Sequence, residues 1–430
     1  MTSATCVNGS DPCLTEDLTM RRNLVNRLFL FIRPIHSQFS YWLMSPKSLC
    51  SLINFNKSLH VSGLFILFVF GVPVSSSLNY IVLPLSLLIS VLLLMLALWF
   101  CFLYLEQTLV YACNEPLSSR LLYTNPSSFG FFTWELVKLH PNGKTGPTII
   151  GFLLLQPNLY QRKSCPVVLL LHGNAGNSTS RLPMCQILKN RFECNIFIID
   201  YRGYGHSTGK PSEEGLYADC KCALDYLYTR NDLNDRKIFV LGRSLGGALA
   251  IYLAGDPVSS RKICGVIIEN TFTSITDAAS HILNIPCKLP SRLFINQYPS
   301  LAKLQSCCKS RKSSSAFPPM LLISGELDNI IPPTMMWKLA EAYENIVTKQ
   351  QIQNDHSSNI YDDSSKGGSL SQKPDTFINS GTDGLVSFPD GHHNDTWFCN
   401  QWSDVILRFI EQSSLRPKST INENDLDISV

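Results

Sequence analysis

The segment LGRSLGGALA, residues 241–250, places one serine between glycines, after an apolar run and before a run of small residues. A sharp turn between a strand and a helix holds such a serine out for attack on a carbonyl carbon. Gly242 and Gly246 relieve the crowding of that turn, and the start of the helix puts a positive dipole end where negative charge develops. The segment therefore predicts Ser244 as a nucleophile.

A serine hydroxyl attacks efficiently only when a base accepts its proton and an acid orients that base. With a serine at this kind of turn, the acid and then a histidine follow it along the chain. Asp328 lies in the segment SGELD after an apolar run and is the predicted acid. Glu326 is the near alternative, and Glu269 is the distant one.

Two adjacent histidines stand in the segment PDGHHND, residues 389–395, after the last apolar run. A histidine in such a loop can reach over the edge of a sheet to the serine and accept its proton. Because adjacent side chains usually point apart, we expect one of the two to act. His393 is the predicted base, and His392 is expected to be a pocket-wall or exposed residue.

The oxyanion formed by an attacked carbonyl needs backbone N–H donors. The residue after the nucleophile supplies one of them, which is Leu245 here. The segment HGNAGN, residues 172–177, follows an apolar run and is expected to supply the other from Asn174. His172 and Gly173 are expected to have structural roles, with His172 bonding its own loop.

The elements that would position these residues are unbroken apolar runs, which are typical of parallel strands buried on both faces. They span residues 167–171, 196–199, 238–241, 263–268, 320–323 and 385–388. A hairpin is predicted before them, with strands at 132–139 and 148–155, and helices are predicted at 215–228, 244–253, 334–343 and 395–412. This alternation predicts an α/β fold with a mostly parallel, doubly wound sheet over residues 131–412.

Two segments interrupt the alternation. Residues 275–319 separate two strands by more than one helix and are interpreted as a small cap over the C-terminal edge of the sheet, which shapes an acyl pocket. Residues 347–383 are rich in Ser, Asp, Asn, Gln and Gly and are expected to be a solvated, disordered insertion. The tail, residues 413–430, is expected to be disordered too.

The chain is only 16% charged but 45% hydrophobic, which favours a membrane segment. Residues 81–105 carry no charge and exceed the roughly 20 residues that cross a bilayer. They are predicted to be a transmembrane signal-anchor helix, followed by a connector at 106–130. The N-terminal region, residues 1–80, includes a second apolar stretch at 61–74 that is short for a span.

Basic residues flank this segment unevenly. The next one after it is Arg120, and six precede it: Arg21, Arg22, Arg27, Arg33, Lys47 and Lys57. Because Lys and Arg are retained in the cytoplasm, a single-pass type II membrane protein is predicted. Its N-terminus would be cytoplasmic, and its large C-terminal part lumenal or extracellular.

The net charge and the cysteine spacing indicate which classes of ligand the chain is not expected to bind. The net charge of +3 gives no basic field for nucleic acid, so none is expected to bind. The 15 cysteines include no Cys-x-x-Cys pair, and neither a metal site nor a cofactor is expected. Glycosylation sequons occur at Asn8, Asn56, Asn177 and Asn394. The last two fall within the predicted site and are expected to be unmodified.

Several segments together resemble membrane-anchored members of the alpha/beta hydrolase domain-containing family. They are HGNAGN (172–177), DYRGYG (200–205), SEEGLY (212–217), GRSLGGA (242–248), ENTF (269–272), ISGELDNIIPP (323–333) and FPDGHHNDTW (388–397). The resemblance runs from residue 85 to 412. It implies an α/β-hydrolase fold behind one signal-anchor span, with Ser244, Asp328 and His393 as the catalytic triad. The insertion at 347–383 and the N-terminal region through Val74 are longer than the resemblance leads us to expect.

These features predict a membrane-anchored serine hydrolase that cleaves acyl esters or thioesters through an acyl-enzyme intermediate. Fold-level analogy suggests protein depalmitoylation. Expected partners are the lipid bilayer and an acylated lipid or protein. The alternatives are a lysophospholipase, lipid esterase or peptidase on the same fold, or a non-catalytic membrane scaffold.

Overall fold

The structure is a computed structural model that describes residues 76–285, 287, 289–310, 317–358 and 383–415. The predicted apolar stretch at 61–74 lies outside these residues, as do most of the 347–383 insertion and most of the tail. The chain divides into two compact units, Met1–Ala97 and Leu98–Val430.

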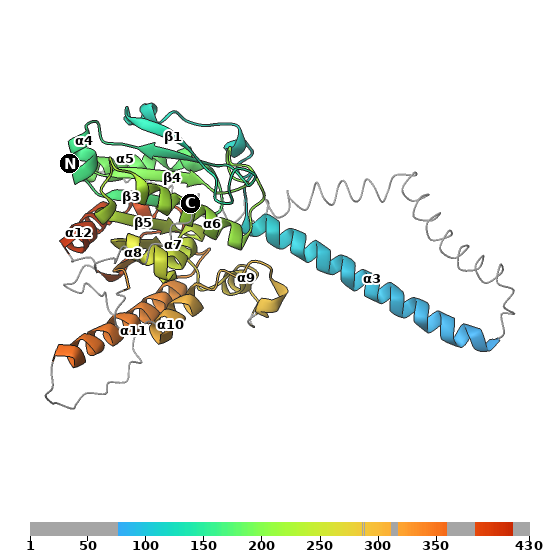
Figure 1. Ribbon diagram of the computed structural model, residues 1–430. Helices are drawn as coiled ribbons and strands as arrows, with labels where there is room; N and C mark the ends of the chain where they lie inside the picture. The colour runs from blue at the N-terminus through green and yellow to red at the C-terminus, as the bar shows by residue number, and fades with distance from the viewer. Residues whose placement is uncertain (1–75, 286, 288, 311–316, 359–382, 416–430) are drawn as a thin grey trace, which may run out of the picture. The chain divides into compact units, whose positions relative to one another are not determined.

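One eight-stranded sheet forms the centre of the second unit, in the order β1-β2-β4-β3-β5-β6-β7-β8 (Figure 1). The strands are β1 (Trp134–Leu139), β2 (Ile149–Leu154), β3 (Val167–Leu171), β4 (Asn195–Asp200), β5 (Ile238–Arg243), β6 (Gly265–Glu269), β7 (Met320–Gly325) and β8 (Gly384–Phe388). β1 pairs antiparallel with β2, and β2 with β4. All later pairs are parallel. The predicted mostly parallel α/β fold opened by a hairpin is confirmed.

Helices cover both faces of this sheet. They are α4 (Leu159–Ser164), α5 (Leu182–Arg191), α6 (Glu213–Thr229), α7 (Leu245–Gly255), α8 (Pro257–Lys262), α9 (Ile275–Ile282), α10 (Ser300–Ser310), α11 (Pro333–Ser358) and α12 (Trp402–Leu415). Buried side chains of α6, α7 and α11 join one apolar core, and those of α5 and α12 join the other. The central strands are apolar without interruption because each faces both cores.

Two helix boundaries differ from the prediction. α11 continues to Ser358, so the first part of the predicted insertion at 347–383 is helical. The residues that extend it include Lys, Gln and Ile and contain neither Gly nor Pro, which permits the helix to continue. α12 begins at Trp402 rather than 395, after a loop with the short 3₁₀ helix η6 (Thr396–Phe398), and it ends at Leu415, inside the predicted tail.

The N-terminal helix α3 (Ser76–Val110) is longer at both ends than the predicted segment 81–105. Among the described residues, only α3 is long and apolar enough to cross a bilayer, and its window Leu88–Val110 has a mean hydropathy of 2.7. The predicted connector, 106–130, therefore begins inside a helix. Glu106 is buried in the second unit, so this part of the connector is packed rather than free.

The predicted cap at 275–319 has two parts. α9 and the short 3₁₀ helix η5 (Ser291–Leu293) follow the C-terminal end of β6, whereas α10 packs against α7 and α11. Leu304 of α10 is 1% exposed and belongs to the main core. α10 is thus a helix of the layer that covers the sheet, and the cap is smaller than the sequence predicts.

Candidate active site

The serine stands on a strained turn between β5 and α7. Ser244 has φ 53° and ψ −118°, a backbone conformation that residues with a side chain rarely adopt. A Cβ at position 242 would clash with the carbonyl of Gly246, and one at 246 with the carbonyl of Leu171. The turn is held because the Ser244 N–H donates to the Glu269 carbonyl over 2.9 Å. The glycines are therefore required by the close approach of neighbouring backbone.

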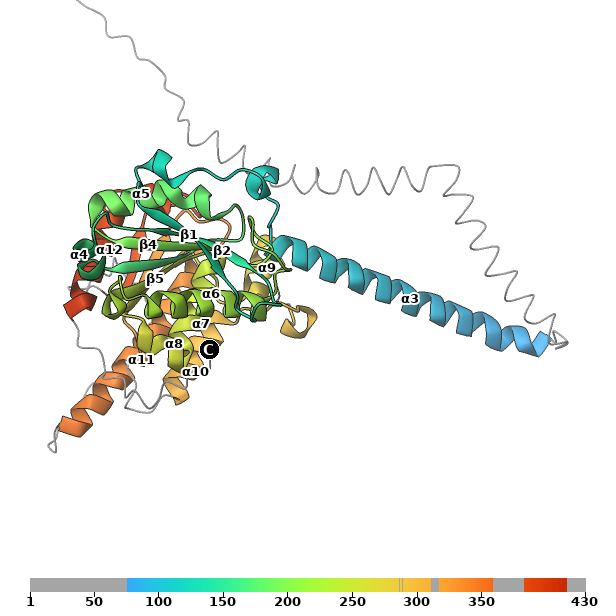
Figure 2. The same cartoon turned by 45° about the horizontal axis from the view of Figure 1, so that its top comes forward.

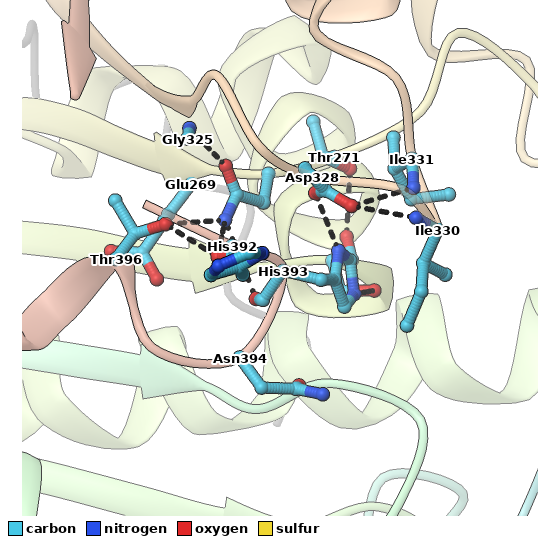
Figure 3. A network of polar contacts seen from close by, with 12 residues as sticks. Glu269, Thr271, Gly325, Asp328, Ile330, Ile331, His392, His393, Asn394 and Thr396 are labelled. Atoms are coloured by element: carbon cyan, nitrogen blue, oxygen red, sulfur yellow. Dashed lines mark hydrogen bonds and ion pairs between the residues drawn. The ribbon is translucent and has the colours of Figure 1, made fainter. Parts of the chain in front are cut away.

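Three of the predicted residues form a chain of hydrogen bonds. His393 Nε2 lies 3.1 Å from Ser244 Oγ, and His393 Nδ1 lies 2.7 Å from Asp328 Oδ2. The second oxygen of Asp328 accepts from the N–H groups of Ile330 and Ile331, at 2.9 and 2.8 Å (Figure 3). Asp328 and His393 are both buried. Backbone N–H groups of its own loop thus hold one oxygen of the Asp328 carboxylate, while the other oxygen bonds to the imidazole of His393.

The alternative carboxylates lie elsewhere. Glu326 is exposed. Glu269 is buried at the end of β6, where it accepts a 2.6 Å hydrogen bond from Trp402 Nε1. Burial raises the pKa of the Glu269 carboxyl. Of the three candidates, only Asp328 makes a hydrogen bond to His393.

The other histidines near the site have different partners. His392 is half-buried, with Nδ1 3.1 Å from the Leu327 carbonyl oxygen. His172 Nδ1 donates to the Gly173 carbonyl over 2.6 Å, and its ring packs on Tyr201 with centroids 4.3 Å apart. Burial lowers the pKa of His172 to about 3, so the ring is neutral near pH 7. Neither histidine contacts the serine hydroxyl.

The loop after β3 lies beside Ser244. A Cβ on Gly173 would stand 3.5 Å from that of Ser244. The Asn174 carbonyl accepts from Tyr204 Oη over 3.1 Å, and the Asn174 side chain donates to the Leu109 carbonyl over 3.0 Å. Within the described part of the chain, the N–H groups of Asn174 and Leu245 make no hydrogen bond. Both remain available as donors.

Asn270, which the sequence did not single out, joins the acid loop to the histidine loop. Its Nδ2 donates to the carbonyls of His392 and His393 over 3.1 and 3.3 Å, and to Thr396 Oγ1 over 2.9 Å. Its Oδ1 accepts from Gly325 N over 2.8 Å. The sequence signal that could have indicated Asn270 is its place in the ENTF segment, directly after an apolar run. Asn270 has a left-handed φ of 46°, which Asn tolerates better than most residues.

Arg243 is a second residue that the sequence did not predict. Its Nη2 donates to the His393 carbonyl over 2.8 Å and to Asn394 Oδ1 over 2.6 Å. Its Nε lies 3.5 Å from Glu269 Oε1, and both side chains are buried. The guanidinium of Arg243, the residue that precedes Ser244, therefore fixes the position of the His393 backbone. Among the described residues, no group of three or more His, Cys, Asp or Glu side chains is placed to bind a metal.

Comparisons with known proteins identify relatives of this chain. The sequence profile of the "alpha/beta hydrolase fold" family matches residues 166–291. Protein bem46 of Schizosaccharomyces pombe is 36% identical over 242 residues, which cover 56% of this chain and 76% of that protein. Alpha/beta hydrolase domain-containing protein WAV2 of Arabidopsis thaliana is 33% identical, covering 57% and 70%. The uncharacterized membrane protein YNL320W of Saccharomyces cerevisiae is 32% identical, covering 59% and 73%.

Proposed function

This chain belongs to the alpha/beta hydrolase domain-containing family, and from that premise we propose that it is a serine hydrolase of acyl esters or thioesters. The observation that carries the proposal is the hydrogen-bonded series of Ser244, His393 and Asp328 at a strained turn. Strain at a residue that also meets a buried imidazole is typical of a functional site. A non-catalytic membrane scaffold, the alternative considered above, would not require a strained serine bonded to a histidine.

In the proposed reaction, Ser244 Oγ attacks the acyl carbonyl while His393 Nε2, 3.1 Å away, accepts its proton. Asp328 stays ionised, keeps Nδ1 protonated and stabilises the imidazolium. His393 then returns the proton to the leaving alcohol or thiol, which leaves an acyl-Ser244 ester. A water molecule, deprotonated by the same imidazole, hydrolyses that ester and restores the serine.

The negative charge on the attacked oxygen needs donors already in place. The N–H groups of Leu245 and Asn174 are proposed to serve, since neither is used within the described part of the chain. Leu245 is the first residue of α7, where the helix dipole favours negative charge. Loss of one such donor typically costs about a hundredfold or more in rate.

Membrane anchoring by α3 is part of the proposal. Its support is the Leu88–Val110 window and the name of one relative, the uncharacterized membrane protein YNL320W. The excess of basic residues before this helix supports a type II orientation. A hydrolase anchored in this way meets acylated lipids and acylated proteins, and protein depalmitoylation is one reaction of that class.

An active-site-directed fluorophosphonate tests the nucleophile. We expect the full-length chain in detergent to be labelled, and Ser244→Ala to be unlabelled, because Ser244 Oγ has His393 Nε2 to accept its proton. Ser306→Ala, at an exposed position of α10, is the matched control and should label like wild type. A folded wild-type protein that takes no label would contradict the proposal.

A further inference from the structure

The C-terminal end of α3 is fixed to the cap by buried contacts. Glu106, 5% exposed, accepts hydrogen bonds from the N–H groups of Ile295 and Asn296, at 3.1 and 2.8 Å, and from Asn296 Nδ2 at 3.0 Å. One turn earlier, the ring of Phe102 meets that of Phe294 edge-on, with centroids 5.3 Å apart. The end of the helix and the cap are therefore one packed structure.

Exposed apolar side chains surround this contact on both elements. Leu105 and Leu109 of α3 are 50% and 54% exposed, and Ile295, whose N–H binds Glu106, is 65% exposed. Ile282 and Leu283, at the end of α9, are 49% and 54% exposed. α9 and the end of α3 lie side by side in both views (Figures 1 and 2). We call these five residues the apolar rim; a group of this kind marks an interaction surface.

The position of the rim along the chain identifies its partner. A bilayer core of about 30 Å takes about 20 helical residues, and the apolar window of α3 runs on to Val110. Glu106, inside that window, is already bound to the cap, so no linker separates the span from the rim. The interfacial layer beyond the hydrocarbon is roughly 5–8 Å deep, which corresponds to about three to five residues of helix. α3 begins at Ser76, so it has enough residues before Glu106 to cross the core, and a span that ends there would place the rim in that layer.

The same helix end also reaches the proposed oxyanion loop. The carbonyl of Leu109, a rim residue, accepts the 3.0 Å hydrogen bond from the Asn174 side chain. Two residues further on, Gly176 N–H donates to the Glu115 carbonyl over 2.7 Å. The loop beside Ser244 is therefore tied to the residues that leave the span.

We propose that the apolar rim inserts into the interfacial layer of the bilayer that α3 spans. The cap then rests on the membrane, and an acyl chain passes from the lipid to Ser244 beside the helix end. This inference rests on the proposed membrane anchoring. It adds a second contact with lipid and a source for the substrate, which is the leaflet next to the domain.

Photo-crosslinking of the full-length chain in phosphatidylcholine vesicles tests this contact. A photoreactive phenylalanine analogue replaces Leu283, and the same analogue replaces Leu159 of α4 as a control of equal exposure, 54% in each case. α4 leads into the N-terminal end of β3, at the opposite edge of the sheet from the site. A third variant, at Leu92 in the apolar window, reports on the span itself. We expect lipid adducts at 92 and 283, and none at 159.

The other outcomes separate the two proposals. Adducts at 92 without adducts at 283 overturn the rim contact and leave the anchoring intact. Absence of adducts at 92 overturns the anchoring, and the rim contact with it. Adducts at 283 that join two protein chains identify a protein interface instead and also overturn the inference.

Activity gives a second measure. The triple variant Ile282→Ser, Leu283→Ser, Ile295→Ser should hydrolyse a long-chain acyl substrate in vesicles about tenfold more slowly, since three apolar side chains lose their burial in lipid. Its rate on a water-soluble short-chain ester should match wild type, because none of the three side chains hydrogen-bonds to the triad. Equal rates on vesicles for the variant and wild type would overturn the rim contact.

Discussion

At the scale of single residues, the position of His393 depends on donors outside the triad. Arg243 and Asn270 both donate to the His393 carbonyl, at 2.8 and 3.3 Å, and both are buried. They come from the ends of β5 and β6, next to the serine in space. The proposed base, His393, is therefore placed by the same sheet edge that places the proposed nucleophile, Ser244, although 149 residues separate the two in sequence.

Asn270→Asp removes this support with little change in shape. The carboxylate still accepts from Gly325 N and tolerates a left-handed backbone, but it cannot donate to the carbonyls of His392 and His393. We expect kcat on a soluble ester to fall by about a hundredfold, since small displacements of catalytic groups cost that much, while KM changes little. Steady-state kinetics measure both.

Asn284→Asp is the matched control for that experiment. Asn284 also has positive φ, 52°, but it is exposed in the cap, and its N–H donates to the His281 carbonyl at the end of α9. It should leave kcat unchanged. If Asn270→Asp keeps wild-type kcat, Asn270 is not a positioning residue.

At the scale of elements, the sequence predicts the strands from local order, and the three residues proposed as the triad are joined by hydrogen bonds in the structure. β3, β5 and β7 are apolar without interruption, and Ser244 and Asp328 follow directly where β5 and β7 end. Parallel strands bring their C-terminal ends to one edge, so residues in those loops meet there.

The missed features depend on contacts that no local pattern contains. Arg243 meets Asn394 across 151 residues, and Asn270 meets His392 across 122. The helix predicted from residue 395 begins at Trp402, and in the loop before it the His392 N–H donates to Asp395 Oδ1 over 2.7 Å. The burial of Glu106 likewise depends on Asn296, far along the chain.

The loop after β3 makes folding stability depend on pH. His172 is buried, and its pKa is lowered to about 3, below the ordinary value of about 6.5 that it recovers on unfolding. Between these values the unfolded chain binds a proton that the folded chain does not. The stabilisation is therefore complete above about pH 6.5 and is lost as the pH falls toward 3, by up to about 1.4 kcal/mol per pH unit.

His172→Gln should abolish this dependence. Its free energy of unfolding should be lower than that of wild type at pH 7, and the difference should shrink as the pH falls from 7 to 5. Denaturant titrations at several pH values measure the difference, in which titration of all other groups cancels. The exposed residue His140 offers the control His140→Gln. Parallel curves for wild type and His172→Gln would show that His172 does not titrate with unfolding.

At the scale of the whole molecule, the fold bears on which side of the membrane the domain occupies. The sequon at Asn177 cannot carry a glycan in this fold, since its side chain is buried and donates to the Ser119 and Leu122 carbonyls over 2.8 Å each. The sequon residue Asn394 is exposed, and its Oδ1 accepts from Arg243 Nη2. A folded lumenal domain would therefore remain without a glycan at Asn177, so its absence there says nothing about orientation.

A new surface sequon makes the orientation measurable. Tyr160→Thr creates the sequence Asn-Leu-Thr at Asn158, which is exposed at the start of α4 and bonds only within that first turn. In the proposed type II orientation, the variant expressed in cells should gain one glycan that a glycosidase removes. Tyr160→Ala, which creates no sequon, should match wild type in mass. A Tyr160→Thr protein that is labelled at Ser244 but carries no glycan would place the domain on the cytoplasmic side, because the folded state and the acceptor site would both be present without the modification.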